Sequence, residues 1–175
     1  NYLRGAQPPP FDILYWNADS TNMPAKMHSE YLRKMYLENR LREPGSIQFA
    51  DVPLDLGKIS IPTYMLATQQ DHIAPWQTVY RGLSLMRGKQ RFVLGESGHV
   101  AGVVNPANSQ KYGYRSNDNL DLAPDAWLES SVRHAESWWQ DWKTWLSTES
   151  GKLLSAKPLA KGLEAAPGSY VKIRL

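Results

Sequence analysis

Residues 61–99, IPTYMLATQQDHIAPWQTVYRGLSLMRGKQRFVLGESGH, decide the fold class of this chain of 175 residues. The apolar run at 61–67 predicts a core strand, and the polar residues after it predict a loop. Residues 76–86 carry an apolar stripe typical of a helix, and residues 91–95 predict a second short strand. Strand, helix and strand within about 35 residues form a βαβ unit with a right-handed crossover. The sequence therefore predicts an α/β fold, with a parallel sheet and flanking helices.

Four further segments have patterns of regular structure. An apolar run at 11–16 predicts a buried strand, and helical spacing at 23–42 predicts a helix. Residues 47–56 could hold a short strand. Residues 125–148 predict one long helix that carries Trp127, Trp138, Trp139, Trp142 and Trp145. We expect these tryptophans to pack the helix on the sheet; the alternative is an exposed aromatic face for a hydrophobic partner.

Composition and charge exclude several classes of protein. The chain has 42% hydrophobic and 21% charged residues, as an ordinary globular protein does, and it has no cysteine. Disulfides, thiolate zinc sites and a cysteine nucleophile within the chain are therefore excluded. The net charge of +3 comes from the tail 151–175 and not from a folded face, which argues against nucleic acid as a partner. No apolar run is long enough for a membrane span and no secretory leader opens the chain, so we expect a soluble protein.

Two ionisable residues follow the two strands of the βαβ unit. Asp71 comes after the first strand and His99 after the second. The carboxyl ends of neighbouring parallel strands share one rim of the sheet, where such folds bind their ligands. A carboxylate that orients an imidazole base makes up two-thirds of a nucleophilic triad, and acid before histidine is the order in α/β-hydrolases. We therefore predict that Asp71 and His99 form a dyad, with Gly98 allowing the tight turn.

The other histidines leave alternatives open. His72 adjoins Asp71 and could be the base instead of His99, or a supporting hydrogen-bonding residue. His28 and His134 lie on predicted helices, where we expect surface or packing roles. The histidines lack metal-ligand spacing and no acidic cluster joins them, so no metal site is predicted.

Five segments carry a resemblance to a known family. They are 9–17 (PPFDILYWN), 71–76 (DHIAPW), 97–106 (SGHVAGVVNP), 137–139 (SWW) and 166–171 (APGSYV). In this order and combination they strongly resemble the polyhydroxyalkanoate synthases, over nearly the whole chain. The medium-chain enzymes usually carry glutamine at the position of Ala101. With alanine there, the chain resembles class I, the short-chain group. Ala107 departs from the pattern, because a second proline commonly stands there.

The resemblance implies an acyltransferase that polymerises (R)-3-hydroxyacyl groups from coenzyme A thioesters and needs no cofactor beyond that substrate. It implies an α/β-hydrolase-like fold with a cap, with residues 1–150 as the C-terminal part of one catalytic domain and 151–175 as a basic tail. It carries the family's catalytic aspartate onto Asp71 and its catalytic histidine onto His99. The third member, a cysteine in a Gly-x-Cys-x-Gly turn, would lie in an upstream part of the same polypeptide.

The resemblance also implies partners and a location. We expect a polyester chain and granule surface as partners, a homodimer, and a cytoplasmic, granule-associated protein. Trp16 and Asp19 follow a predicted strand and could line the substrate pocket, or serve only as packing and turn residues. Ala101 is predicted to lie near the acyl pocket; the alternative is a small residue required where its loop packs on the sheet.

Two other functions remain open. One is a hydrolase of the same fold, an esterase or polymer depolymerase, in which Asp71 and His99 serve an upstream serine. The other is a non-catalytic, granule-binding fragment that uses the tryptophan helix and the basic tail.

Overall fold

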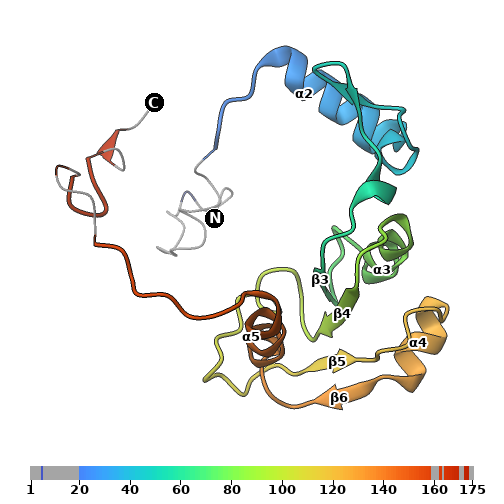
Figure 1. Cartoon of the computed structure of the whole chain (residues 1–175), viewed down its shortest axis with the longest axis vertical. Helices are drawn as coiled ribbons and strands as arrows, with labels where there is room; N and C mark the ends of the chain where they lie inside the picture. The colour runs from blue at the N-terminus through green and yellow to red at the C-terminus, as the bar shows by residue number, and fades with distance from the viewer. Residues whose placement is uncertain (1–4, 6–19, 159–161, 163, 170–171, 174–175) are drawn as a thin grey trace.

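The computed structural model describes residue 5 and residues 20–158, 162, 164–169 and 172–173. The predicted strand at 11–16 lies outside the described residues, together with Trp16 and Asp19. The main sheet has four strands in the order β3-β4-β5-β6 (Figure 1). Its strands are β3 (Thr63–Thr68), β4 (Gln90–Gly95), β5 (Tyr114–Ser116) and β6 (Val132–His134).

The predicted βαβ unit is confirmed. β3 and β4 pair in parallel over six residues each, from Thr63 opposite Gln90 to Thr68 opposite Gly95. The helix between them, α3 (Trp76–Gly82), continues into a 3-10 turn at Leu83–Leu85. Pro75 stands immediately before α3 with φ of −53°, a value that its ring imposes and that suits the residue before a helix. The carboxyl ends of β3 and β4 therefore lie side by side, as the site prediction requires.

The single long helix predicted at 125–148 is wrong. The chain forms α4 (Pro124–Ser130), then strand β6, then α5 (Trp138–Glu149). Ser137 begins α5, because its hydroxyl accepts a hydrogen bond from the amide of Trp139. His134, predicted on a helix, lies on β6, where its Nε2 is 2.9 Å from the hydroxyl of Ser116.

The sequence predicted a parallel sheet, but the sheet is mixed. β5 runs antiparallel to both β4 and β6. β5 and β6 have three residues each, and their pairing satisfies backbone groups that a longer helix would have satisfied internally. The chain remains α/β, with one parallel pair and an antiparallel extension.

The N-terminal described segment forms short, irregular elements. Helix α2 (Ala25–Tyr31) continues as a π-helical stretch at Leu32–Leu37 and is followed by a 3-10 turn at Arg40–Arg42. A small hairpin of β1 (Gln48–Phe49) and β2 (Val52–Pro53) lies beside it (Figure 1). The helix predicted at 23–42 is thus present with interruptions, and His28 lies on it. Among the described helices, none combines the length and apolar character needed to cross a membrane.

Aromatic residues fill the core on one face of the sheet, where α3 and α4 pack. Trp127 of α4 is fully buried, with its ring centroid 4.9 Å from that of Phe92 on β4 and 5.6 Å from that of Tyr80 on α3. Trp127 therefore lies on a different helix from the later tryptophans, although the sequence pattern predicted one helix for all of them.

Helix α5 covers the opposite face of the sheet (Figure 1). Asp141 of this helix accepts hydrogen bonds from the hydroxyl of Tyr64 at 2.9 Å and from Nε of Arg91 at 2.7 Å. Burial and the Asp141 carboxylate raise the pKa of Tyr64, so its hydroxyl stays protonated as the donor. Trp145 packs on Tyr64 with ring centroids 5.4 Å apart. The predicted packing on the sheet is confirmed in α5 for Trp138 and Trp145, whose rings contact Tyr64, whereas Trp139 and Trp142 are exposed.

Candidate active site

Backbone hydrogen bonds join the loops that follow β3 and β4. The amide of Gln69 donates to the carbonyl of Gly95 at 2.8 Å, and the amide of Gln70 donates to the carbonyl of Ser97 at 2.9 Å. These bonds extend the contact between the two strands beyond their ends. The residues that follow, including Asp71 and His99, are thereby brought to one rim of the sheet.

Asp71 is held as an anion by the backbone of its own loop. Its Oδ1 accepts hydrogen bonds from the amides of Ile73 at 2.8 Å and Ala74 at 3.0 Å. The bond from Ala74 chiefly, with that from Ile73 and smaller contributions from His99 and His72, holds the pKa of Asp71 below its ordinary value, against the opposing effect of burial. The carboxylate is 13% exposed and ionised at neutral pH, so it can pair with an imidazolium or orient a neutral imidazole.

His99 lies opposite this carboxylate. Its Nδ1 is 3.8 Å from Oδ1 of Asp71, which is within ion-pair range but longer than a hydrogen bond. The side chain of His99 is 42% exposed, so the rest of the ring is open to a reacting group. The structure brings together the two residues that the sequence predicted as a dyad.

The tight turn before His99 is made differently from the prediction. The residue in the left-handed region is Ser97, with φ of 70°, while Gly98 has no positive φ. The following residues form a helical turn, in which the amide of Gly102 donates to the carbonyl of Gly98 and the amide of Val104 to that of Val100, each at 2.8 Å. His99 thus lies near the start of a compact turn.

His72 lies beside His99. It is exposed, and its ring meets that of His99 edge-on with centroids 5.6 Å apart. The ion pair of Asp71 is with His99. This geometry favours His99 over His72 as the partner of the carboxylate and leaves His72 at the rim of the site.

Ala101 is exposed on the same turn. The small residue that packing requires is its neighbour Gly102, where a Cβ would lie 2.4 Å from the carbonyl oxygen of Glu96 and 2.7 Å from Cγ2 of Thr68. The alternative, that the loop needs a small residue where it packs on the sheet, therefore describes Gly102 and not Ala101.

Sequence reasoning missed the residues that hold the turn from outside. Glu96 accepts from the amide of Gly113 at 2.8 Å and pairs with Arg133, whose Nε lies 2.6 Å from Oε1. The hydrogen bond from Arg133 chiefly lowers the pKa of Glu96. Ser137, fully buried, donates a hydrogen bond to the carbonyl of Asn105 at the end of the turn. Of these residues, only Ser137 had a signal in the sequence, because it belongs to the segment 137–139 that carries the family resemblance.

A cavity of about 460 Å³ lies elsewhere. It opens between the amino-terminal end of β4 and α5 and is lined by Arg91, Asp118, Asp141 and Trp145 among others; neither Asp71 nor His99 lines it. Among the described residues, no cluster of three or more histidine, aspartate or glutamate side chains could hold a metal ion. Trp16 lies outside the described residues, so its predicted place in the pocket remains a prediction.

The arrangement can orient an imidazole, but the chain has no cysteine to serve as its nucleophile. The carboxylate is ionised, and the imidazole opposite it is half exposed. Because the chain has no cysteine, a thiol that His99 could activate must come from outside these 175 residues.

Comparison with known proteins confirms the resemblance in sequence. Six curated poly(3-hydroxyalkanoate) polymerases are 39–46% identical to the chain over 99% of its length. The polymerase subunit PhaC of Cupriavidus necator is 43% identical, and that of Rhizobium meliloti is 46% identical. No family model matches the chain.

The match covers only part of each relative. The chain spans 30% of the length of the Cupriavidus necator protein and 29% of that of Rhizobium meliloti. A weaker similarity, 27% identity over 74 residues, links 42% of the chain to 29% of the putative carbamate hydrolase RutD of Pseudomonas savastanoi pv. phaseolicola.

Proposed function

We propose that this chain supplies the aspartate and histidine of a Cys-His-Asp triad in a polyhydroxyalkanoate synthase. The observation that carries the proposal is the approach of His99 Nδ1 to Asp71 Oδ1, 3.8 Å, at the joined ends of two parallel strands. The similarity to poly(3-hydroxyalkanoate) polymerases over 99% of the chain supports the same chemistry. The cysteine belongs to a part of the polypeptide outside this chain, on an α/β-hydrolase-like fold of which residues 1–150 form the C-terminal part.

His99 acts first as a base. It takes the proton of the cysteine thiol, and the thiolate attacks the carbonyl carbon of an (R)-3-hydroxyacyl-coenzyme A. The carbon–sulfur bond to coenzyme A breaks, coenzyme A leaves as the thiol after taking a proton, and an acyl-enzyme thioester remains. Asp71, anionic and fixed by two amides, orients the ring and stabilises its protonated form.

Chain growth needs a second proton transfer. The 3-hydroxyl of one unit attacks the thioester of another, loses its proton to His99 or Asp71, and the ester bond forms as the thiol is released. The exposure of the two side chains, 42% for His99 and 13% for Asp71, supports His99 as the acceptor of this proton.

The acyl group is proposed from the residue at position 101. The medium-chain enzymes of the family usually carry glutamine where this chain has Ala101, so the resemblance supports class I with 3-hydroxybutyryl-coenzyme A as substrate. His72 and Trp16 complete the substrate-binding residues of the proposal. The enzyme works as a homodimer in the cytoplasm, at the surface of the polyester granule that it makes, and uses no cofactor besides the thioester substrate.

Release of coenzyme A tests the proposal in the complete polypeptide. His99→Ala should abolish release from 3-hydroxybutyryl-coenzyme A, because it removes the base. His72→Ala is the matched control, since it removes the neighbouring imidazole, and it should keep measurable turnover. The reverse result would assign the base to His72.

A hydrolase is the second candidate, favoured by the similarity of 74 residues to a putative carbamate hydrolase. In a hydrolase Asp71 and His99 would serve a serine. The residue in the nucleophile turn of the complete polypeptide separates the two, since a serine labelled by a fluorophosphonate would favour the hydrolase. A non-catalytic, granule-binding protein would instead remain associated with granules after loss of both Asp71 and His99.

A further inference from the structure

The place of His99 depends on the backbone of its turn. Among the described residues, the imidazole meets the Asp71 carboxylate at 3.8 Å and the ring of His72. Neither contact is a hydrogen bond that would fix the ring. The geometry of the dyad therefore follows from how firmly residues 98–104 are attached to the rest of the molecule.

Two adjacent tryptophans at the start of α5 make this attachment. The indole Nε1 of Trp138 donates to the carbonyl of Gly102 at 3.1 Å and to that of Val103 at 3.2 Å. Nε1 of Trp139 donates to the carbonyl of Val103 at 3.1 Å. The two rings meet edge-on with centroids 6.0 Å apart. Both indoles therefore reach the same stretch of backbone, three to four residues after His99.

The two accepting carbonyls lie at the end of the turn, where backbone donors become scarce. Inside the turn the amides of Gly102 and Val104 bond back to earlier carbonyls. Among the described residues, the carbonyl of Val103 also accepts from the amide of Asn105 at 3.0 Å, whereas the carbonyl of Gly102 accepts no hydrogen bond from the backbone. An indole N–H can only donate, so the pairing satisfies both sides.

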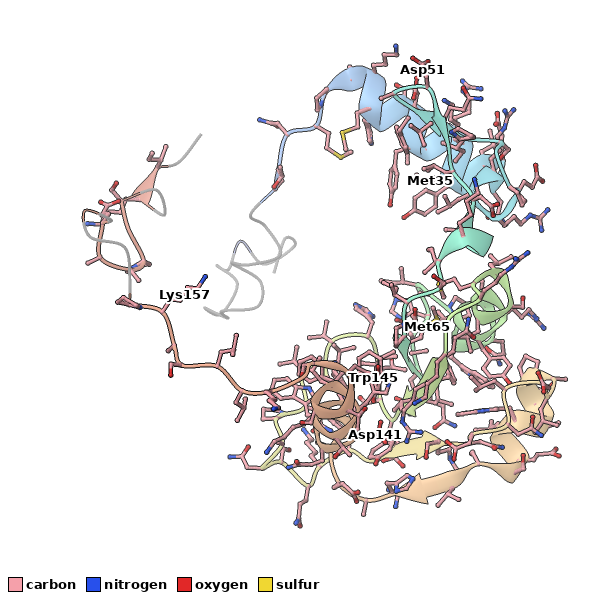
Figure 2. All side chains as sticks on the ribbon, viewed as in Figure 1. Met35, Asp51, Met65, Asp141, Trp145 and Lys157 are labelled. Carbon is pink, nitrogen blue, oxygen red and sulfur yellow. The ribbon has the colours of Figure 1, made fainter. Side chains whose placement is uncertain are left out.

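The helix that carries the two indoles is itself fixed to the strands that carry the dyad. Asp141 binds Tyr64 of β3 and Arg91 of β4, and Figure 2 shows Asp141 and Trp145 where α5 approaches these strands. β3 leads to Asp71 and β4 leads to His99. Helix α5 therefore links the amino-terminal ends of both strands to the turn that follows β4 at its carboxyl end.

We propose that Trp138 and Trp139 are positioning residues for His99, whose indole N–H groups hold its turn so that the imidazole faces Asp71. The positioning follows from the hydrogen bonds alone; its consequence for turnover rests on the proposed function. Neither tryptophan is assigned a contact with substrate.

Trp145 provides a matched control on the same helix. Its ring packs on Tyr64, as that of Trp138 does, with centroids 5.4 Å apart. Its Nε1 is buried and has no hydrogen-bond partner among the described residues. Trp145→Phe thus makes the same chemical change as Trp138→Phe without removing a hydrogen bond to the turn.

The test compares Trp138→Phe, Trp139→Phe and Trp145→Phe in the complete polypeptide. Hydrogen exchange read by mass spectrometry follows the amides of Gly102 and Val104. Loss of one indole donor should speed their exchange about five- to tenfold, the effect expected for one net hydrogen bond. In the same variants kcat for coenzyme A release should fall several-fold while KM stays within about twofold, because binding groups are untouched. Trp145→Phe should leave exchange and kcat at the wild-type values.

Two outcomes would overturn the proposal. Equal effects of Trp145→Phe and Trp139→Phe would mean that ring packing matters and the N–H groups do not. Faster exchange with unchanged kcat would mean that the turn is stabilised without His99 being positioned. If Trp138→Phe does not fold, Trp139→Phe decides, because its side chain is 37% exposed at the rim. If the wild type releases no coenzyme A, the proposed function fails, and the exchange rates alone still decide whether the indoles hold the turn.

Discussion

Gly102→Ala would put a methyl group where the turn of His99 lies against the sheet. A Cβ at this position lies 2.4 Å from the carbonyl oxygen of Glu96, 2.7 Å from Cγ2 of Thr68 and 2.9 Å from the carbonyl oxygen of Gly98. Two of these neighbours are backbone atoms, which no side-chain rotation can move away. The turn must therefore shift off β3. We expect a loss of about 2–3 kcal/mol in the free energy of unfolding, the upper part of the range for overpacking.

Urea unfolding followed by tryptophan fluorescence measures this loss in the polypeptide that carries the chain. With an m-value of about 2 kcal/mol/M, the unfolding midpoint should fall by about 1–1.5 M. The same shift moves His99 relative to Asp71, so kcat should fall in the fraction that folds. Ala101→Ser at the neighbouring exposed position is the matched control and should change the midpoint little. An unchanged midpoint and rate for Gly102→Ala would refute the reasoning, because the turn would then have room that the structure does not give it.

Three further predictions concern the dyad, the pocket and the missing nucleophile. Asp71→Asn should slow single-turnover acylation less than His99→Ala if the carboxylate orients the ring; an equal or larger loss would assign it direct proton transfer. Because the folded state lowers the pKa of Asp71 from 3.8, its stabilising effect is present above that value and is lost as the pH falls through the lowered one. Acid titration of stability should therefore be flatter in Asp71→Asn. Ala101→Gln should shift the ratio of kcat/KM between C4 and longer thioesters several-fold, since one methylene of misfit costs about 1–3 kcal/mol; an unchanged ratio with a lower melting temperature would contradict the pocket assignment. The 175-residue chain alone should release no coenzyme A above background, because it lacks the thiol.

The local parts of the fold were predictable from the sequence. β3, α3 and β4 follow from continuous apolar runs and one apolar stripe, and parallel pairing follows from their succession. Asp71 and His99 could be found because strand ends that are adjacent in the sheet place them together.

The non-local parts were not predictable. β5 and β6 have three residues each, and only pairing across the sheet makes them strands. The spacing of Trp127 and Trp138 fits one helix, although α4 and α5 lie on opposite faces of the sheet. Bonds from an indole to the backbone of a turn some 35 residues earlier leave no periodic signal.

The central claim is that His99, paired with Asp71, activates a cysteine that lies outside this chain. Intact-protein mass spectrometry of the complete polypeptide, quenched shortly after mixing with 3-hydroxybutyryl-coenzyme A and followed by peptide mapping, tests it most directly. The account predicts a 3-hydroxybutyryl thioester on one cysteine in the wild type and none in His99→Ala. An acyl group on a serine, or a cysteine thioester that forms as fast in His99→Ala as in the wild type, would contradict it.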